Sequence, residues 1–142
     1  MGLLIDTNVF IAAERARQAM NLSQWLAQIP TEWEGSDALI SVITVSELEL
    51  GVHRADDESR RERRRAFVEA IIEQFGIAPI DARVARCHAR LSAELMTAGQ
   101  IIGTHDSWIA ATGIAYGHAV VTADIDEFRR VPGLSVIPMA LS

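Results

Sequence analysis

Four acidic side chains stand where apolar segments end or where helices are expected to begin. Asp6 follows the apolar run 3–5, and Asp124 follows the apolar run 119–122. Glu47 and Asp106 lie in the opening turns of two expected helices. Because ligands bind outside the carboxyl ends of strands in open α/β sheets, we expect these four carboxylates to converge at one sheet edge.

Carboxylates packed into one partly dry cleft repel each other and take up protons instead of ionising. A divalent cation removes this repulsion. Mg²⁺ and Mn²⁺ prefer oxygen ligands, and Mg²⁺ keeps several waters while taking one or two carboxylates plus a substrate phosphate. Such a cation acidifies a bound water and stabilises the oxyanions of an in-line phosphoryl displacement. The pattern therefore predicts metal-assisted phosphodiester hydrolysis.

Each acid also has an ordinary structural interpretation. Asp6 and Asp106 could cap the helices that follow them, because a short oxygen acceptor satisfies free backbone N–H groups. Asp124 suits a turn, and Glu47 with Glu49 suits an exposed helix surface. We favour the site because each acid is embedded among apolar residues and not in a polar loop.

The elements that must position these acids alternate along the chain. We expect strands at 2–5, 38–41, 77–80, 119–122 and 134–137. We expect helices at 8–17, 21–28, 45–54, 57–75, 82–98 and 106–116. This alternation predicts an α/β fold with a mostly parallel sheet sandwiched by helices. With no repeat or linker, residues 1–142 are expected to form one domain.

Composition narrows the class of protein. No apolar run approaches the roughly 20 residues that span a bilayer, and Asp6 interrupts an N-terminal run that no basic residue precedes, unlike a signal peptide. The single cysteine, Cys87, permits no internal disulfide and no zinc cluster. We therefore expect a soluble, cytoplasmic protein without a membrane partner.

The formal net charge of −6 has the wrong sign for generic nucleic-acid binding through phosphate neutralisation. It leaves open a nucleic-acid enzyme whose acidic centre holds metal ions, because a bound cation reverses the local field.

Four motifs then carry a family resemblance. In chain order they are LLIDTN, SVITVSELELG, IGTHDSWIAATG and VVTADIDEFRRVPGLSV, which together extend from residue 3 to about residue 137. They resemble the motifs of PIN-domain ribonucleases, specifically the VapC toxins of bacterial toxin–antitoxin pairs. The resemblance implies a PIN-like three-layer sandwich, with a short central sheet flanked by helices.

The resemblance also implies an activity and partners. It implies Mg²⁺-dependent endonucleolytic cleavage of RNA, with Mn²⁺ as a substitute, leaving a 5′-phosphate and a 3′-hydroxyl. It further implies inhibition by a small cognate antitoxin of the VapB type, whose tail lies across the active site, and a homodimer.

Roles carry over by motif. Asp6 and Asp106 match the principal metal-binding aspartates, expected to bind the ion directly. Glu47 matches the glutamate of the helix motif. Asp124 matches the fourth acidic position, where many relatives have asparagine, so the acidic set is complete. Glu47 and Asp124 are expected to bind the ion directly or through water.

Other residues near the motifs have supporting or open roles. Thr7 and Thr122 match small hydroxyl positions that orient water or a carboxylate. Asp126 is either an extra acid or a surface residue, and His105 either contacts substrate or is a solvated residue at the helix entry.

Other phosphoryl chemistries fit less well. Haloacid-dehalogenase phosphatases and receiver domains use a lysine near the phosphoryl group, and the chain contains no lysine. The phosphatases also expect a second aspartate where Asn8 stands. A metal-free ribonuclease needs a general base and a general acid, usually histidines. The chain's histidines are scattered over different elements, at His53, His88, His105 and His118.

Two further features stay open at this stage. The run SRRERRRAF (59–67) is either a solvated helix face or a phosphate-binding patch formed by Arg60, Arg61, Arg64 and Arg65. The alternative from another functional class is a catalytically inactive PIN-like module that only docks a protein. Such a module would place aromatic side chains in an apolar groove. The candidates for that groove are Trp25, Trp33, Trp108 and Phe10.

Overall fold

The computed structural model describes residues 2–15 and 35–139. Its elements in chain order are β1 (Gly2–Ile5), α1 (Thr7–Arg15), β2 (Ala38–Ser41), α3 (Val42–His53), α4 (Glu58–Gln74), β3 (Gly76–Ala78), α5 (Ala82–Thr97), α6 (Thr104–Tyr116), β4 (His118–Thr122), α7 (Ile125–Phe128) and β5 (Val136–Pro138). The expected helix 21–28, with Trp25, and the loop residue Trp33 lie outside the described residues.

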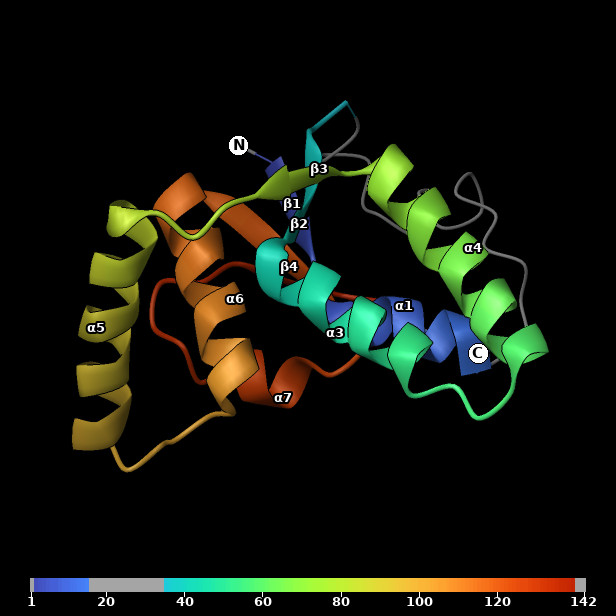
Figure 1. Ribbon diagram of the computed structural model, residues 1–142. Helices are drawn as coiled ribbons and strands as arrows, with labels where there is room; N and C mark the ends of the chain where they lie inside the picture. The colour runs from blue at the N-terminus through green and yellow to red at the C-terminus, as the bar shows by residue number, and fades with distance from the viewer. Residues whose placement is uncertain (1, 16–34, 140–142) are drawn as a thin grey trace.

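The five strands form one sheet in the order β3-β2-β1-β4-β5 (Figure 1). Every pairing between them is parallel, and β1 lies at the centre, with Leu3 opposite Ala38 of β2 and Ala119 of β4. All five carboxyl ends therefore meet at one edge. The segments that leave β1, β2 and β4 at that edge carry Asp6, α3 and Asp124.

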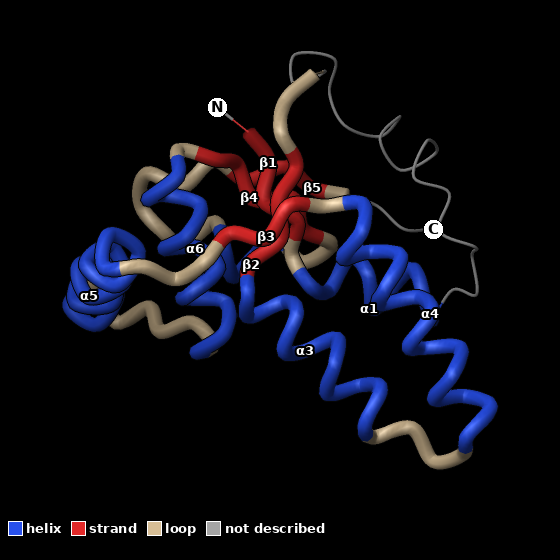
Figure 2. Tube along the Cα trace, turned by 45° about the horizontal axis from the view of Figure 1, so that its top comes forward, coloured by secondary structure: helices blue, strands red, loops and turns tan. Residues whose placement is uncertain are grey.

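Helices cover both faces of the sheet. Figure 2 shows α5 and α6 on one side of the strands and α1, α3 and α4 on the other. Successive strand residues point to opposite faces. Leu3 and Ile5 accordingly pack with α1, α3 and α4, whereas Leu4 packs with α5 and α6. The structure confirms the three-layer α/β sandwich and shows a sheet that is parallel throughout its described strands. No helix within 2–15 and 35–139 combines the length and apolar character needed to cross a bilayer.

Several element boundaries differ from the expected ones in ways that matter for the site. α3 begins at Val42, directly after β2, because the Ser41 hydroxyl accepts a hydrogen bond from the Ile43 N–H at 3.0 Å and caps the helix. α6 begins at Thr104 with Gly103 at its N-cap, so Asp106 lies in the first turn. The sequence patterns also missed α7, and they placed β3 and β5 one to two residues away from their observed positions.

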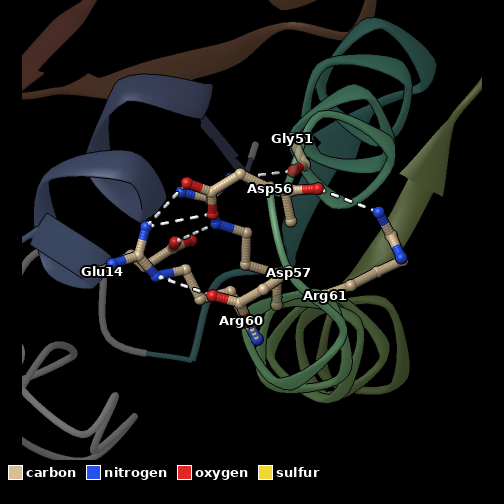
Figure 3. Close-up of polar contacts among 8 residues, drawn as sticks. Glu14, Gly51, Asp56, Asp57, Arg60 and Arg61 are labelled. Atoms are coloured by element: carbon tan, nitrogen blue, oxygen red, sulfur yellow. Dashed lines mark hydrogen bonds and ion pairs between the residues drawn. The ribbon is translucent and has the colours of Figure 1, made fainter.

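The arginine run of α4 is largely engaged within the protein. Figure 3 shows the polar contacts around this segment. Arg60 pairs with Asp56 at 3.0 Å, and Arg61 pairs with Glu58 at 2.9 Å. These arginines neutralise neighbouring carboxylates at the start of α4, which argues against the phosphate-patch interpretation for them.

Arg64 connects three helices. Its Nε donates to Glu14 Oε1 of α1 at 3.0 Å, and its Nη1 donates to the Gly51 carbonyl of α3 at 2.9 Å. The Arg64 guanidinium therefore fixes α4 against both neighbours, while Arg65 on the same helix stays exposed.

Substituting Arg64 by glutamine is expected to lower the free energy of unfolding by about 1 kcal/mol, because both interhelical contacts are lost from a partly exposed position. The exposed Arg63 provides a matched control, and Arg63→Gln should change stability by less than about 0.5 kcal/mol. Chemical denaturation measures both values, and equal losses would show that the Arg64 contacts contribute nothing.

Candidate active site

Asp6 lies between β1 and α1 and is only 2% exposed. Its Oδ2 accepts a hydrogen bond from Thr122 Oγ1 of β4 at 2.9 Å. Burial raises the pKa of this carboxyl to about 6, against the opposing effect of hydrogen bonds from Thr122 and the Thr7 backbone; nearby Glu47 and Asp124 raise it further. Asp6 is thus a buried carboxyl whose ionisation costs free energy.

Glu47 projects from α3 toward the same edge. Its Oε1 accepts from Thr7 Oγ1 at 2.9 Å, and Thr7 Oγ1 lies 2.8 Å from Thr44 Oγ1. Its Oε2 is 3.4 Å from Nδ1 of the exposed His105. Thr7 is buried and so holds one Glu47 oxygen in a fixed orientation.

Asp106 occupies the first turn of α6 and is half-buried. Its pKa is raised to about 8, chiefly by burial. A hydrogen bond with Glu127 and the charges of Asp6, Glu127 and Glu47 also raise it. The hydrogen bond with Asp106 and another from the Gly103 N–H, at 2.7 Å, hold the pKa of Glu127 below its usual range. The directions of these two shifts indicate that Asp106 is the donor and Glu127 the acceptor of their hydrogen bond.

Asp124 stands at the start of α7 and is exposed. Its side chain makes no capping hydrogen bond to that helix. Its backbone N–H donates to Thr122 Oγ1 at 3.0 Å, and Thr122 Oγ1 in turn donates to Asp6. The fully buried Thr122 hydroxyl thus connects the two acidic positions that follow β1 and β4.

The four acids predicted from sequence meet at the carboxyl edge of the sheet. Their charges interact: Glu47 and Asp124 raise the pKa of Asp6, and Asp6 and Glu47 raise the pKa of Asp106. Two of the four acids, Glu47 and Asp106, line a cleft of about 390 Å³ at this edge, together with Gly103, Thr104 and His105.

Side-chain helix capping, the main structural alternative, is seen at other aspartates, whereas the Asp6 carboxyl accepts a hydrogen bond from the Thr7 N–H at the start of α1 and another from Thr122. Asp57 caps α4 by accepting from the Arg60 N–H at 2.7 Å, and Asp81 caps α5 by accepting from the Val84 N–H at 3.0 Å. The N-cap of α6 is Gly103, which leaves the Asp106 carboxyl available to the cleft.

Glu127 is a site residue that the sequence patterns missed. It lies three positions after Asp124 on α7, a helix of four residues that is too short to show helical periodicity. The extra acid considered from sequence, Asp126, is exposed, in agreement with its interpretation as a surface residue.

The interpretation that Phe10 lines an aromatic docking groove is wrong. Phe10 is 0% exposed and packs edge-on against Phe75 in the core, with ring centroids 5.5 Å apart. Trp108 is half-buried and stacks on His88 at 3.7 Å, and the remaining candidates, Trp25 and Trp33, lie outside the described residues.

The residues present fit a divalent metal. The acidic set offers only carboxylate oxygens, which hard cations prefer. Asp6 and Asp106 carry raised pKa values that a nearby cation would lower. Within the described part of the chain, no three acidic, histidine or cysteine side chains are grouped as a ready-made set of metal ligands.

Replacing Thr122 by valine tests the link between Asp6 and Asp124. Valine is similar in shape but leaves the Asp6 oxygen and the Asp124 N–H without their shared partner, so we expect a 10- to 100-fold weaker metal affinity. Thr122→Ser keeps the hydroxyl and should bind metal like the unchanged protein. Isothermal titration with Mn²⁺ measures these affinities, and wild-type affinity in Thr122→Val would remove this role.

Comparison with known proteins agrees with this geometry. The PIN domain family model matches residues 3–134. Ribonuclease VapC1 of Rickettsia felis is 35% identical over 140 residues, covering 99% of this chain and 98% of that protein. The tRNA(fMet)-specific endonuclease VapC of Salmonella typhimurium is 30% identical, covering 96% of each chain.

Solved structures show the same fold. The toxin–antitoxin structure VapBC-5 of Mycobacterium tuberculosis contains a chain with a TM-score of 0.75 and 31% identity, covering 97% of this chain and 98% of that one. VapBC2 of Rickettsia felis, bound to a DNA fragment from its promoter, contains one with a TM-score of 0.84 and 25% identity, covering 99% and 100%. PIN-domain nucleases of the VapC type are metal-dependent. Fold, acidic edge and relatives together show that the chain belongs to the PIN-domain family, among the VapC ribonucleases.

Proposed function

We propose that this ribonuclease is a Mg²⁺-dependent endoribonuclease, with Mn²⁺ as a substitute, and that it is the toxin of a VapBC-type pair. The observation that carries this proposal is the convergence of Asp6, Glu47, Asp106 and Asp124 at the carboxyl edge of one parallel sheet. Its relatives' names and complexes support the RNA substrate and a cognate antitoxin of the VapB type.

The proposed roles follow from the family resemblance. Asp6 and Asp106 would hold the ion directly, and Glu47 and Asp124 would hold it directly or through water. When bound, the ion would acidify a water and offset charge that develops on the scissile phosphate. Thr7 fixes Glu47 and Thr122 fixes Asp6, so two ligands are oriented by buried hydroxyls.

Asp106 and Glu127 are linked by a hydrogen bond that Asp106 donates. Because a metal ligand must be deprotonated, Asp106 would have to give up this proton in order to hold the ion. Glu127 accepts a hydrogen bond from the Gly103 N–H and keeps the first turn of α6 in place.

We further propose, from the family, that the chain forms one PIN domain over residues 1–142, assembles as a homodimer, and acts in the cytoplasm, where RNA and antitoxin are both present. RNA products would carry a 5′-phosphate and a 3′-hydroxyl.

The test is a cleavage assay with the purified protein and total RNA of its host. Cleavage should require Mg²⁺ or Mn²⁺, stop with chelator, and leave ends that ligate as 5′-phosphates. Adding the protein encoded by a neighbouring short reading frame should suppress it. RNA that stays intact with either metal would refute the nuclease proposal, and cleavage that no neighbouring protein suppresses would refute the toxin–antitoxin proposal.

A further inference from the structure

One flank of α5 carries a row of three arginines. Arg83, Arg86 and Arg90 stand at i, i+3 and i+7, which places them on one side of the helix. Together with Ala82 and Cys87 they line a hollow of about 560 Å³. The opposite side of α5 is occupied by core residues, namely Val84, Leu91 and Leu95.

The positive charges of this arginine flank are not neutralised locally. Within the described residues, no carboxylate lies within 4.0 Å of any of the three guanidinium groups. The guanidinium of Arg83 lies over the ring of Tyr116, 4.7 Å from its centroid, and this cation–π contact does not neutralise its charge. Arg60, Arg61 and Arg64 of α4 differ, because each is paired with a carboxylate.

An unneutralised basic row on a chain with a net charge of −6 selects for a polyanionic partner. From Arg83 to Arg90 it extends over about 10 Å of helix. α5 and α6 pack side by side as a hairpin, and the connection between them, residues 98–103, leads into the wall of the acidic cleft (Figure 1). The arginine flank begins at the other end of this hairpin, where Arg83 contacts Tyr116 at the end of α6, and it extends from there along α5 to Arg90. An RNA strand that leaves the cleft along the hairpin would meet this basic surface.

We propose that the arginine flank of α5 binds the phosphate backbone of the RNA substrate away from the cleaved bond. This inference rests on the proposed ribonuclease function. Phosphate contacts fix the register of a nucleic acid without reading its sequence. The flank would thus supply general RNA affinity that the acidic cleft itself cannot supply.

The test compares two double variants in an Asp6→Asn background, where RNA is bound without being cut. Arg86→Gln/Arg90→Gln removes two charges of the flank and leaves the Arg83–Tyr116 contact in place. Arg63→Gln/Arg65→Gln removes two exposed charges of α4 and is the matched control. Fluorescence anisotropy with a labelled structured RNA, over a series of salt concentrations, measures affinity and its salt slope.

We expect the α5 variant to bind RNA on the order of tenfold more weakly at 0.1 M salt, with a salt slope smaller by about 1 to 2. The control should match its Asp6→Asn parent. In the active background, the α5 variant should raise KM for the same RNA and leave the turnover of a dinucleotide unchanged.

Equal behaviour of the two double variants would overturn this inference while cleavage by the unchanged protein still supports the proposed function. An α5 variant that changes the oligomeric mass in light scattering, with no change in salt slope, would identify the flank as a protein interface and would also overturn it. No cleavage of RNA by the unchanged protein would instead refute the proposed function.

Discussion

Asparagine in place of Asp6 is expected to lower the rate of RNA cleavage by about 10³-fold or more, a loss of roughly 4 kcal/mol in transition-state stabilisation. Asparagine has nearly the same shape and keeps an acceptor for the Thr122 hydroxyl, which now bonds Oδ2. It removes a negative ligand, and with it the ion's contribution at the scissile phosphate. Single-turnover rates at saturating Mg²⁺ measure the effect.

Asp126 supplies the control for this experiment, because it is an exposed acid two positions from Asp124. Asp126→Asn should cleave at the wild-type rate. Asp6→Asn should also keep a native circular dichroism spectrum, so that loss of activity is not loss of fold. An Asp6→Asn protein that cleaves within threefold of wild type would exclude Asp6 from the machinery.

The second large effect concerns the stability of the metal-free protein, which is expected to fall as pH rises from about 4 to about 8. The folded pKa values, about 6 for Asp6 and about 8 for Asp106, exceed the ordinary value of 3.8. The folded state therefore binds more protons than the unfolded state in this window. Stability contributed by the protonated carboxyls is complete below the ordinary pKa and is lost as pH rises through the folded values.

For Asp6 the shift corresponds to about 3 kcal/mol, because one pKa unit is about 1.4 kcal/mol and the group is almost fully buried. The half-buried Asp106 adds to it in the same direction, whereas Glu127, whose pKa is lowered in the folded state, acts in the opposite direction. Adding Mg²⁺ should reverse the loss, by about 2.7 kcal/mol at 100 times Kd. Denaturation curves at pH 5, 6.5 and 8, with and without Mg²⁺, check these values.

Asp106→Asn isolates the contribution of the second carboxyl. Without metal at pH 8 this variant should be more stable than wild type, because no charge is forced into the site. It should also gain less stability from Mg²⁺. A wild-type protein whose metal-free stability is flat from pH 5 to 8 would contradict the assigned burial cost.

The acidic edge could be predicted from sequence because each part of it has a local signal. Apolar runs mark β1 and β4, and an acid follows each run. The rule that parallel strands share one carboxyl edge then brings Asp6 and Asp124 together. Glu47 and Asp106 were found in the same way, from their places at the beginning of helices next to that edge.

What sequence reasoning missed depends on tertiary contacts. Glu127 lies on a single turn, α7, and its role arises only because α7 packs beside the start of α6. The sequence analysis considered the arginine run of α4 and not the arginines of α5. In the structure Glu14 and Gly51 contact Arg64 from other helices, whereas the α5 arginines meet no carboxylate in the described residues. Phe10 suited either a groove or a core, and only the packing of α1 on the sheet decides between them.

Anomalous diffraction from a crystal soaked in Mn²⁺ is the most direct test of the central claim that Asp6, Glu47, Asp106 and Asp124 enclose a metal. We expect a manganese peak in the cleft, with carboxylate oxygens of Asp6 and Asp106 in its coordination shell and Glu47 and Asp124 bound directly or through water. A soaked crystal in which manganese is bound at other positions, while these four side chains point away from one another with no ion between them, would contradict the claim.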